Sequence, residues 1–431
     1  MRSSAISLRS IFWGCNYYGK TEPQREGAKG AKFMDFNYTE EQQMLKDSLD
    51  KFLAKNYSFE LRREIINTRL GMSPLAWEGF ASMGLLGLTI PPEYDGFGGS
   101  GVDTMLVMEA FGRRLVVEPY LATVVLGTSA IVLGGTEEQR KVLLPRVANG
   151  KFKLAFAHGE PASRYSPTRV QTTARIEGGQ WVINGRKSVV LHGAVCDLLV
   201  VSARTSGAVD DAHGISLFFV NPGEAGVSGR EYPTYDGMRA AEVEFQNVHV
   251  NTDSLIGVLD QAQPLIELVI ERGVAALCAE AIGCMEALNQ ATLEYLKTRQ
   301  QFGVPIGKFQ ALQHRMVDML IQYEQAKSMA CLAAVKVDAP DPQERRRAVS
   351  AAKELIGRAG RFIGQEAIQL HGGMGMTDEL AVGHYFKRLT AIDTTFGESD
   401  FHLARFAASQ GAEEQQQPSF VPAKSRWKQL V

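Results

Sequence analysis

Between two long apolar stretches the chain carries the segment Leu296-Lys-Thr-Arg-Gln-Gln-Phe-Gly-Val-Pro-Ile-Gly-Lys-Phe-Gln-Ala-Leu-Gln313. The flanking stretches, 265–288 and 315–337, have helical apolar spacing, and Gly303, Pro305 and Gly307 interrupt it. The segment therefore joins two helices. Arg299 and its neighbouring amides offer the groups that bind phosphates and nucleotide edges. A polar loop without a ligand is the alternative, and this segment alone does not decide between the two.

A second segment, Gln369-Leu-His-Gly-Gly-Met-Gly-Met-Thr-Asp-Glu379, also ends a long helical pattern. Three glycines within four residues allow the backbone to approach a ligand closely. Taken alone, a glycine C-cap followed by a turn explains it better.

Together the two segments resemble the paired signature of the acyl-CoA dehydrogenase family. They read Arg299-x-Gln-Phe-Gly-x-Pro-Ile-x-x-Phe-Gln310 and Gln369-x-x-Gly-Gly-x-Gly375, in the order and at the separation usual in that family. The resemblance can be followed from about residue 34 to about residue 407. It implies an all-α N-terminal domain, an antiparallel β middle domain and a C-terminal antiparallel four-helix bundle.

Composition is consistent with such a protein. The chain of 431 residues is long enough for two or three domains. Its net charge of -2 gives no indication of nucleic-acid binding, and no apolar run reaches the length of a membrane span. The five cysteines form no CxxC pair and have no partnering histidines, so we expect buried thiols, no metal site and a cytoplasmic, reducing compartment.

The periodicity of apolar residues divides the chain. Residues 34–150 read as helices, with capping boxes at Thr39-Glu-Glu-Gln42 and Thr136-Glu-Glu-Gln139, the second opening a helix that we expect to stop at Pro145. Residues 151–256 alternate with period two, with Asn184-Gly185 as a hairpin turn and no intervening helix, which predicts an antiparallel sheet. Residues 257–408 are helical again, and we expect helices at 265–297, 311–338, 344–370 and from Thr377 to Lys387 or beyond.

The two ends differ from the rest. In residues 1–33, Arg2, Arg9, several serines and the lack of an acid before Glu22 resemble a weak transit peptide, which would place the protein in the mitochondrial matrix. Because this stretch has no clear amphipathic face, we instead expect an over-long start, with the fold beginning at Met34 of a bacterial protein. Residues 409–431 are rich in Gln, Glu and Pro, and we expect a disordered or peripheral tail.

The resemblance implies FAD as cofactor and an acyl-CoA as substrate. A carboxylate of such an enzyme removes the α-proton, and the flavin takes the β-hydride. The family positions that contact the diphosphate and adenosine side of FAD, shared between subunits, are occupied here by Arg299, Gln301, Phe302, Gln310, Gln369, Gly372 and Gly373. The resemblance therefore implies at least a dimer, commonly a dimer of dimers.

The flavin-ring side departs from the family pattern. The usual Thr-Glu-Pro-x-x-Gly-Ser-Asp is replaced by Gly159-Glu-Pro-Ala-Ser-Arg-Tyr-Ser166. Gly159 stands at a flavin-contacting threonine, and Tyr165 stands at a serine that meets flavin or CoA. Leu191 takes the place of a second flavin-contacting threonine. These side chains cannot make the corresponding hydrogen bonds to the ring.

The catalytic base is the larger departure. Most members carry it in Tyr-Glu-Gly-Thr, where this chain has Thr395-Phe-Gly-Glu-Ser-Asp400, so that Gly397 stands at the base position and Glu398 one residue later. A minority carry it early in the helix before the signature, where this chain has Gly273; Glu271 lies about 200° away round the helix. Three hypotheses remain: Glu398 is the base, Glu271 is the base, or this chain supplies none.

The third hypothesis agrees with a more specific resemblance, to bacterial proteins described as the small subunit of pimeloyl-CoA dehydrogenase. Such a chain is expected to pair with a larger, base-bearing homologous subunit, to act on pimeloyl-CoA or another dicarboxylyl-CoA, and to pass electrons to an electron-transfer flavoprotein. A non-catalytic, FAD-sharing paralogue is the alternative, and an oxidase or flavin monooxygenase of the same fold is a third possibility. The segments that carry this resemblance are Glu118-Pro-Tyr-Leu-Ala-Thr-Val-Val-Leu-Gly127, Ser188-Val-Val-Leu-His-Gly193, Ala275-Ala-Leu-Cys-Ala-Glu280 and His384-Tyr-Phe-Lys-Arg-Leu-Thr390.

Overall fold

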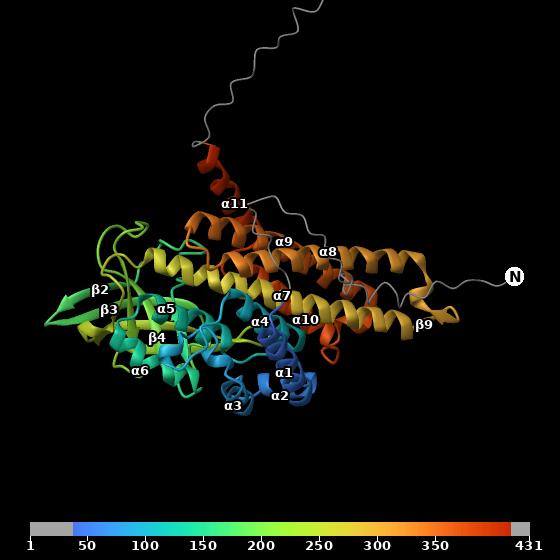
Figure 1. Cartoon of the computed structure of the whole chain (residues 1–431), viewed down its shortest axis with the longest axis horizontal. Coiled ribbons are helices and arrows are strands. Elements are labelled where there is room, and N and C mark those ends of the chain that lie inside the picture. The colour runs from blue at the N-terminus through green and yellow to red at the C-terminus, as the bar shows by residue number, and fades with distance from the viewer. Residues whose placement is uncertain (1–37, 415–431) are drawn as a thin grey trace, which may run out of the picture. The chain divides into compact units, whose positions relative to one another are not determined.

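The computed structural model describes residues 38–414, so the expectations for 1–33 and for residues 415–431 of the tail lie outside this range. Residues 409–414, expected to belong to a disordered or peripheral tail, instead continue the last helix, Ser399–Glu414. Helices come first in the chain, as expected (Figure 1). Their bounds are α1 Glu40–Asn56, α2 Phe59–Ile66, α3 Pro74–Ser82, α4 Gly101–Arg114, a π-helix Leu121–Gly127, α5 Thr128–Gly134 and α6 Glu137–Ala148.

The capping box of α6 is confirmed, but the predicted end of that helix is wrong. Thr136 and Gln139 exchange the two capping hydrogen bonds. The helix continues through Pro145 to Ala148. Proline removes a single hydrogen bond near the helix end, while Leu144 and Val147 on either side of it are fully buried, and that burial keeps the last turn helical.

The middle of the chain forms one eight-stranded sheet in the order β6-β7-β3-β2-β4-β5-β8, with β1 paired to β4. Most pairs are antiparallel, as predicted, but β1 and β2 each run parallel to β4. The strands are β1 Leu154–Ala157, β2 Thr173–Glu177, β3 Gln180–Leu191, β4 Leu198–Arg204, β5 Ile215–Val220, β6 Val227–Pro233, β7 Arg239–Val250 and β8 Leu255–Ile256.

The expected hairpin turn is displaced. Gly178 and Gly179, with φ of +59° and +84°, make the turn between β2 and β3. Asn184 and Gly185 instead lie inside β3, where the register against β7 shifts. A Cβ at Gly185 would stand 2.5 Å from the Thr172 Cα, so the glycine serves close backbone contact at a bulge and not a turn.

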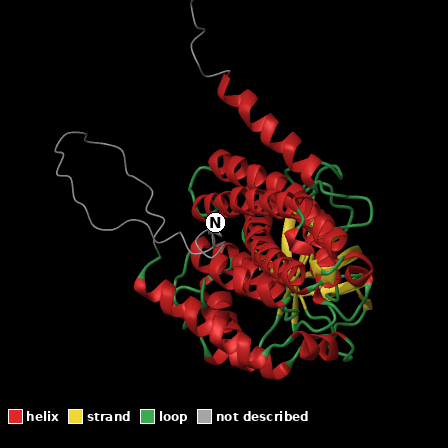
Figure 2. Ribbon diagram, turned by 90° about the vertical axis from the view of Figure 1, so that its right-hand side faces the viewer, coloured by secondary structure: helices red, strands yellow, loops and turns green. Residues whose placement is uncertain are grey.

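The C-terminal helices form the expected bundle. Figure 1 shows α7, α8 and α9 side by side, with the short β9–β10 hairpin (Gln300–Gln301 and Val304–Pro305) at the end of the bundle away from β2 and β3. In the view turned by 90° the helices crowd together in front of the strands (Figure 2). The bounds are α7 Gln263–Thr298, α8 Gln310–Lys336, α9 Pro342–His371, α10 Ala381–Thr394 and α11 Ser399–Glu414.

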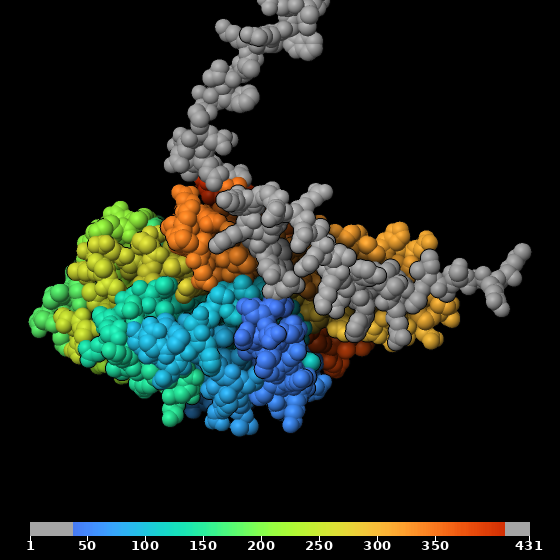
Figure 3. All heavy atoms as spheres, in the orientation of Figure 1, coloured from blue at the N-terminus to red at the C-terminus, as the bar shows by residue number. Residues whose placement is uncertain are grey.

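The three regions pack against one another. Helix α4 lies along α7, and β1 abuts the π-helix. In the space-filling view the blue-to-teal surface of the first helices adjoins the green surface of the sheet (Figure 3). Within residues 38–414 no helix combines the length and the apolar character needed to cross a membrane.

Candidate functional site

A cavity of about 520 Å³ lies at the end of the bundle where α7 and α9 stop. The β9–β10 hairpin and the glycine segment after α9 both contribute to its wall. It brings together five of the seven sequence-predicted cofactor residues: Arg299, Gln301, Gln369, Gly372 and Gly373.

The other two predicted residues, Phe302 and Gln310, are not among those that line this cavity. Phe302 and Gly303 have φ of +55° and +78°, the pair of positive values of a type I′ hairpin turn. Positive φ is uncommon for a bulky side chain, and the Phe302 ring is 90% exposed. The hairpin therefore presents a phenyl group outward, away from the cavity wall.

The glycine segment leaves room for a ligand. Helix α9 ends at His371, and a Cβ at Gly372 or Gly373 would meet no atom within 4 Å. Tyr295 stacks on His371 with the ring centroids 4.4 Å apart and donates a hydrogen bond to its carbonyl oxygen. Burial lowers the pKa of His371, so this floor of the cavity is uncharged near neutral pH.

Sequence reasoning missed Tyr295, His371 and Arg315 as cavity residues. Tyr295 precedes Arg299 by one helical turn, which was the available signal for it. Arg315 matters because the C-terminal end of α9 carries partial negative charge. Arg299 and Arg315 supply the positive charge that a phosphate requires here, although Glu366 lies 3.3 Å from Arg315.

The predicted base position lies in a different region, in the turn 395–398 between α10 and α11. Gly397 has φ of +117°. A Cβ at this position would stand 2.4 Å from the Phe401 Cδ1 and 2.7 Å from the His402 Nε2. The backbone therefore has no room for a side chain where most of the family carries its carboxylate.

Two buried groups hold this turn by its carbonyl oxygens. Lys353 Nζ donates to the oxygens of Gly397, at 2.6 Å, and Asp393, at 2.8 Å. His402 Nε2 lies 3.1 Å from the Phe396 oxygen, which can only accept, so Nε2 carries the proton. Burial lowers the pKa of Lys353 to about 8 and that of His402 to about 3.

Glu398 lies beside this turn and faces outward. Its Oε1 is 3.4 Å from Nη2 of Arg164, which comes from the loop 159–166 after β1. The side chain of Glu398 is 37% exposed and that of Arg164 is 80% exposed. The carboxylate thus sits in a surface ion pair that joins the sheet region to the start of α11.

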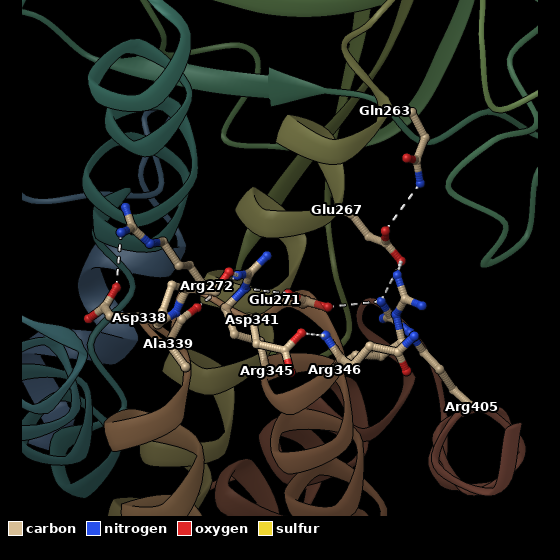
Figure 4. A network of polar contacts seen from close by, with 12 residues as sticks. Gln263, Glu267, Glu271, Arg272, Asp338, Ala339, Asp341, Arg345, Arg346 and Arg405 are labelled. Carbon is tan, nitrogen blue, oxygen red and sulfur yellow. Dashed lines mark hydrogen bonds and ion pairs between the residues drawn. The ribbon is translucent and has the colours of Figure 1, made fainter. Parts of the chain in front are cut away.

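Glu271 lies in a buried cluster of charges on the other side of α7. Its carboxylate accepts hydrogen bonds from Nη2 of Arg405, at 3.0 Å, and Nε of Arg345, at 3.3 Å (Figure 4). Arg405 and Arg346 also bind Glu267, one turn earlier. Burial raises the pKa of Glu271, the two arginines opposing that effect. Both oxygens are directed at α9 and α11.

Gly273 faces a different part of the structure. A Cβ there would stand 2.7 Å from the Leu126 Cδ2 and 3.0 Å from the Phe396 Cε2. This contact brings the two family base positions together, because Phe396 precedes Gly397. We use the term thioester cleft for the region between Gly273, the turn 395–398 and the loop 159–166, a name taken from the role that the family resemblance implies for these segments and not from a cavity.

The cavity and the thioester cleft are far apart on one chain. Both regions touch α7, the cavity at Tyr295 and the cleft at Gly273. These residues are 22 positions apart in an uninterrupted helix, which at about 1.5 Å per residue is about 33 Å. A single ligand cannot occupy both sites of one chain unless it exceeds that length.

Models of three domains of one known protein family match this chain. Those of the N-terminal, middle and C-terminal domains of acyl-CoA dehydrogenase match residues 39–151, 155–248 and 265–410. The chain belongs to the acyl-CoA dehydrogenase family. Acyl-CoA dehydrogenase FadE12 of Mycobacterium tuberculosis is 30% identical over 354 residues, which cover 80% of this chain and 90% of FadE12.

Solved structures of other proteins are similar to this chain over most of its length. Butyryl-CoA dehydrogenase of Megasphaera elsdenii superposes with a TM-score of 0.80 at 25% identity, covering 88% of this chain and all of that one. The ChsE4-ChsE5 complex of Mycobacterium tuberculosis gives 0.79 at 25% identity, covering 90% of this chain and all of the matched chain. The expected fold is confirmed, and the chain is an oxidoreductase of a family that uses FAD.

The two regions fit FAD unequally. The cavity offers arginines, amides and open space beside Gly372 and Gly373, which suit phosphates and an adenosine. On the ring side, Gly159 has no side chain and Leu191 has no hydrogen-bonding group. The adjoining Lys187 and Glu160 are consumed in a buried ion pair of 2.7 Å. We call the cavity the ADP half-site, because its residues fit the ADP half of FAD better than Gly159 and Leu191 fit the flavin ring.

Proposed function

We propose that this chain is one subunit of a heteromeric, FAD-dependent acyl-CoA dehydrogenase. It binds the ADP half of a flavin whose ring lies in a homologous, larger partner subunit, and that partner supplies the catalytic base. The observation that carries the proposal is the contrast between a formed cavity at one end of α7 and a cleft without a usable carboxylate near the other.

Distance supports a shared flavin. The separation of about 33 Å along α7, between the cavity at Tyr295 and the family base position at Gly273, supports a flavin that spans two subunits. In this proposal the ADP half-site serves a flavin whose ring lies in another subunit. The exposed hairpin ring of Phe302, beside the cavity, is available to contact that subunit.

The surroundings of the two glutamates favour a base outside this chain. Glu398 is engaged by Arg164 at the surface, and Glu271 is engaged by Arg345 and Arg405 in the protein interior. The positions where a carboxylate would be expected are glycines, and a Cβ would stand 2.4 Å from the Phe401 Cδ1 at Gly397 and 2.7 Å from the Leu126 Cδ2 at Gly273. Of the three hypotheses for the base, these contacts support the last.

The role of the chain in the reaction is then to bind and orient. FAD, when bound, accepts the β-hydride of the acyl-CoA. Arg299 and Arg315 would hold the phosphates of FAD, and Gln301 and Gln369 would offer hydrogen bonds to its adenosine side. The resemblance to pimeloyl-CoA dehydrogenase small subunits supports a dicarboxylyl-CoA substrate, and family membership supports an electron-transfer flavoprotein as acceptor.

We place the enzyme in the cytoplasm. The four cysteines among residues 38–414, Cys196, Cys278, Cys284 and Cys331, are free thiols, which suits a reducing compartment.

Binding of ADP to the purified chain tests the half-site without a partner. By calorimetry we expect Arg299→Ala to weaken ADP binding by about tenfold or more, because a charge-assisted contact to phosphate contributes roughly 1.5–3 kcal/mol. Arg358→Ala is the matched control, since Arg358 pairs with Glu354 on the surface of α9 and is not among the cavity residues. Equal loss in both variants, or no loss in Arg299→Ala, contradicts the assignment.

A further inference from the structure

We infer that a further cavity of this chain binds the phosphate group of a small phosphorylated ligand. The cavity has a volume of about 390 Å³ and lies between α2, the turn that joins β6 to β7, and α10. We term it the α2–α10 pocket. It shares no lining residue with the ADP half-site and has no part in the proposed function.

Cationic side chains from three segments far apart in the sequence line the α2–α10 pocket. Arg63 belongs to α2, Arg239 is the first residue of β7, and Lys387 belongs to α10. Arg239 is engaged by the protein, because its Nη2 donates to the Thr68 oxygen at 2.7 Å and its Nη1 lies 3.8 Å from Oε1 of Glu231. Arg63 and Lys387 are therefore the two cations that a ligand can reach most readily.

Arg63 and Lys387 are held only loosely. Nη2 of Arg63 is 3.7 Å from Oδ2 of Asp378, and Nζ of Lys387 is 3.9 Å from Oδ1 of the same carboxylate. Both separations exceed hydrogen-bonding distance, and neither cationic group donates a hydrogen bond to any other residue within 38–414. Exposed ion pairs of this kind contribute little to stability, so a ligand can replace Asp378 as their partner with little loss.

The second carboxylate in the wall, Asp236, does not repel an anion. It is buried and lies 2.7 Å from Arg388, which also binds Glu280. Arg62 donates to the backbone oxygen of Asp236 and completes a buried group of two cations and two anions. Burial lowers the pKa of His384, so that lining ring adds no charge near neutral pH. The positive excess of the pocket is therefore not cancelled from below.

A phosphate monoester matches these cations better than a carboxylate does. It carries a charge of about −1.5 to −2 at pH 7 and three acceptor oxygens, whereas a carboxylate has one charge and two oxygens. Arg63 and Lys387, placed around one point, supply donors for several oxygens at once. The backbone N–H groups of Tyr235 and Asp236, in the turn 234–237, have no hydrogen-bond partner among the described residues and add two further donors.

The rest of the wall suits a small polar body. The volume of the pocket falls in the range of about 300–1,000 Å³ that is usual for small-molecule sites. Ile66 and Pro233 supply a small apolar surface, and Tyr235, which is 56% exposed, offers a ring face to a sugar or a base. A sugar phosphate or a nucleoside monophosphate therefore has the size and polarity that the pocket accepts.

Calorimetric titration of the full chain purified alone tests the α2–α10 pocket, with AMP, ribose 5-phosphate and inorganic phosphate as probes. We expect AMP or ribose 5-phosphate to bind, and Arg63→Ala and Lys387→Ala each to weaken that binding about tenfold, because each removes a charge-assisted contact to phosphate. Arg358→Ala is the matched control, since Arg358 lines neither cavity, and it should leave binding unchanged. Tighter binding of AMP supports a nucleotide as ligand, and tighter binding of ribose 5-phosphate supports a sugar phosphate.

The inference is overturned if none of the three probes binds, if neither variant weakens their binding, or if adenosine binds as tightly as AMP. Circular dichroism checks that each variant folds, and if one does not, the other carries the test. Loss of probe binding in Arg299→Ala but in neither Arg63→Ala nor Lys387→Ala places the phosphate at the ADP half-site alone, which overturns the pocket and leaves the proposed function standing. Probe binding that depends on Arg63, in a wild type that does not bind ADP, contradicts the proposed function alone.

Discussion

Gly397 shows how a single position can remove a catalytic group. Its φ of +117° is a backbone conformation that side chains rarely adopt, and Phe401 and His402 occupy the space beside it. The missing carboxylate is therefore built into the backbone of the turn and is not a simple side-chain replacement.

We expect Gly397→Glu to destabilise the chain without creating a base. Positive φ and overpacking together cost roughly 2–5 kcal/mol in the free energy of unfolding. Gly178→Glu is the matched control, because Gly178 also has positive φ but no atom within 4 Å of its Cβ position, and it should cost only about 1–2 kcal/mol. Denaturant unfolding measures both, and equal losses would show that packing at Gly397 is not limiting.

The buried His402 makes the stability of the fold depend on pH in the acid range. Its pKa is lowered to about 3 from 6.5, chiefly by burial and then by Lys353. Below pH 6.5 the unfolded chain takes up a proton that the folded chain refuses, so stability is full above pH 6.5 and falls as the pH drops toward 3.

The variant His402→Gln takes up no proton at this position when it unfolds, while its amide can still donate a hydrogen bond to the Phe396 oxygen. We expect the free energy of unfolding to fall less steeply below about pH 6 than in the wild type, by about 1.4 kcal/mol per pH unit. Urea unfolding at several pH values measures the two slopes. Parallel slopes would mean that His402 titrates normally in the folded chain.

At the scale of elements, helix α7 contacts every region of the candidate site. One face carries Gly273 toward the thioester cleft, another carries Glu267 and Glu271 toward α9 and α11, and its last turns carry Tyr295 to the cavity. The charge cluster of Figure 4 thus fixes α9 and α11 against α7 near the cleft.

We expect Glu271→Gln to lower the free energy of unfolding by about 3 kcal/mol, because it leaves the buried Arg345 without its counter-charge and leaves Arg405 with Glu267 alone. Glu294→Gln on the same helix is the control, since its surface pair with Lys297 contributes about 0–1 kcal/mol. If the two variants unfold alike, the cluster does not stabilise the bundle.

The long helices of the bundle were predictable because their apolar spacing continues for many turns, and α7, α8 and α9 start and end within about two residues of expectation. The prediction of a hairpin turn at Asn184-Gly185 was wrong because the same dipeptide occurs in turns and in bulges. Which of the two forms depends on the pairing with β7, which is distant in the sequence. The prediction that α6 ends at Pro145 was wrong because burying the neighbouring apolar side chains stabilises the last turn by more than the lost hydrogen bond costs.

Part of the candidate site was predictable from the sequence, and part was not. Arg299, Gln301, Gln369, Gly372 and Gly373 belong to two short segments, and the structure brings them together in one cavity. The contacts of Phe396 with Gly273, and of Glu398 with Arg164, join segments more than a hundred residues apart. No local pattern encodes such contacts, so these neighbours became visible only in the folded chain.

At the scale of the whole molecule, the account requires two different subunits. In the proposed enzyme the ADP half-site of this chain serves the partner's flavin, while Gly159 and Leu191 of this chain offer no side-chain hydrogen bond to a flavin ring. We expect the assembled enzyme to hold one FAD for each pair of unlike subunits, measured as flavin absorbance against protein concentration. One FAD for every chain would contradict this division of the site.

The most direct test is the visible spectrum of the chain purified alone, supplied with FAD and recorded anaerobically before and after addition of pimeloyl-CoA or octanoyl-CoA. The account predicts that the flavin band keeps its intensity with both thioesters, because this chain supplies no base to remove the α-proton. Bleaching of the band that Glu398→Gln abolishes would contradict it, and would identify Glu398 as the base of a chain that is catalytically complete.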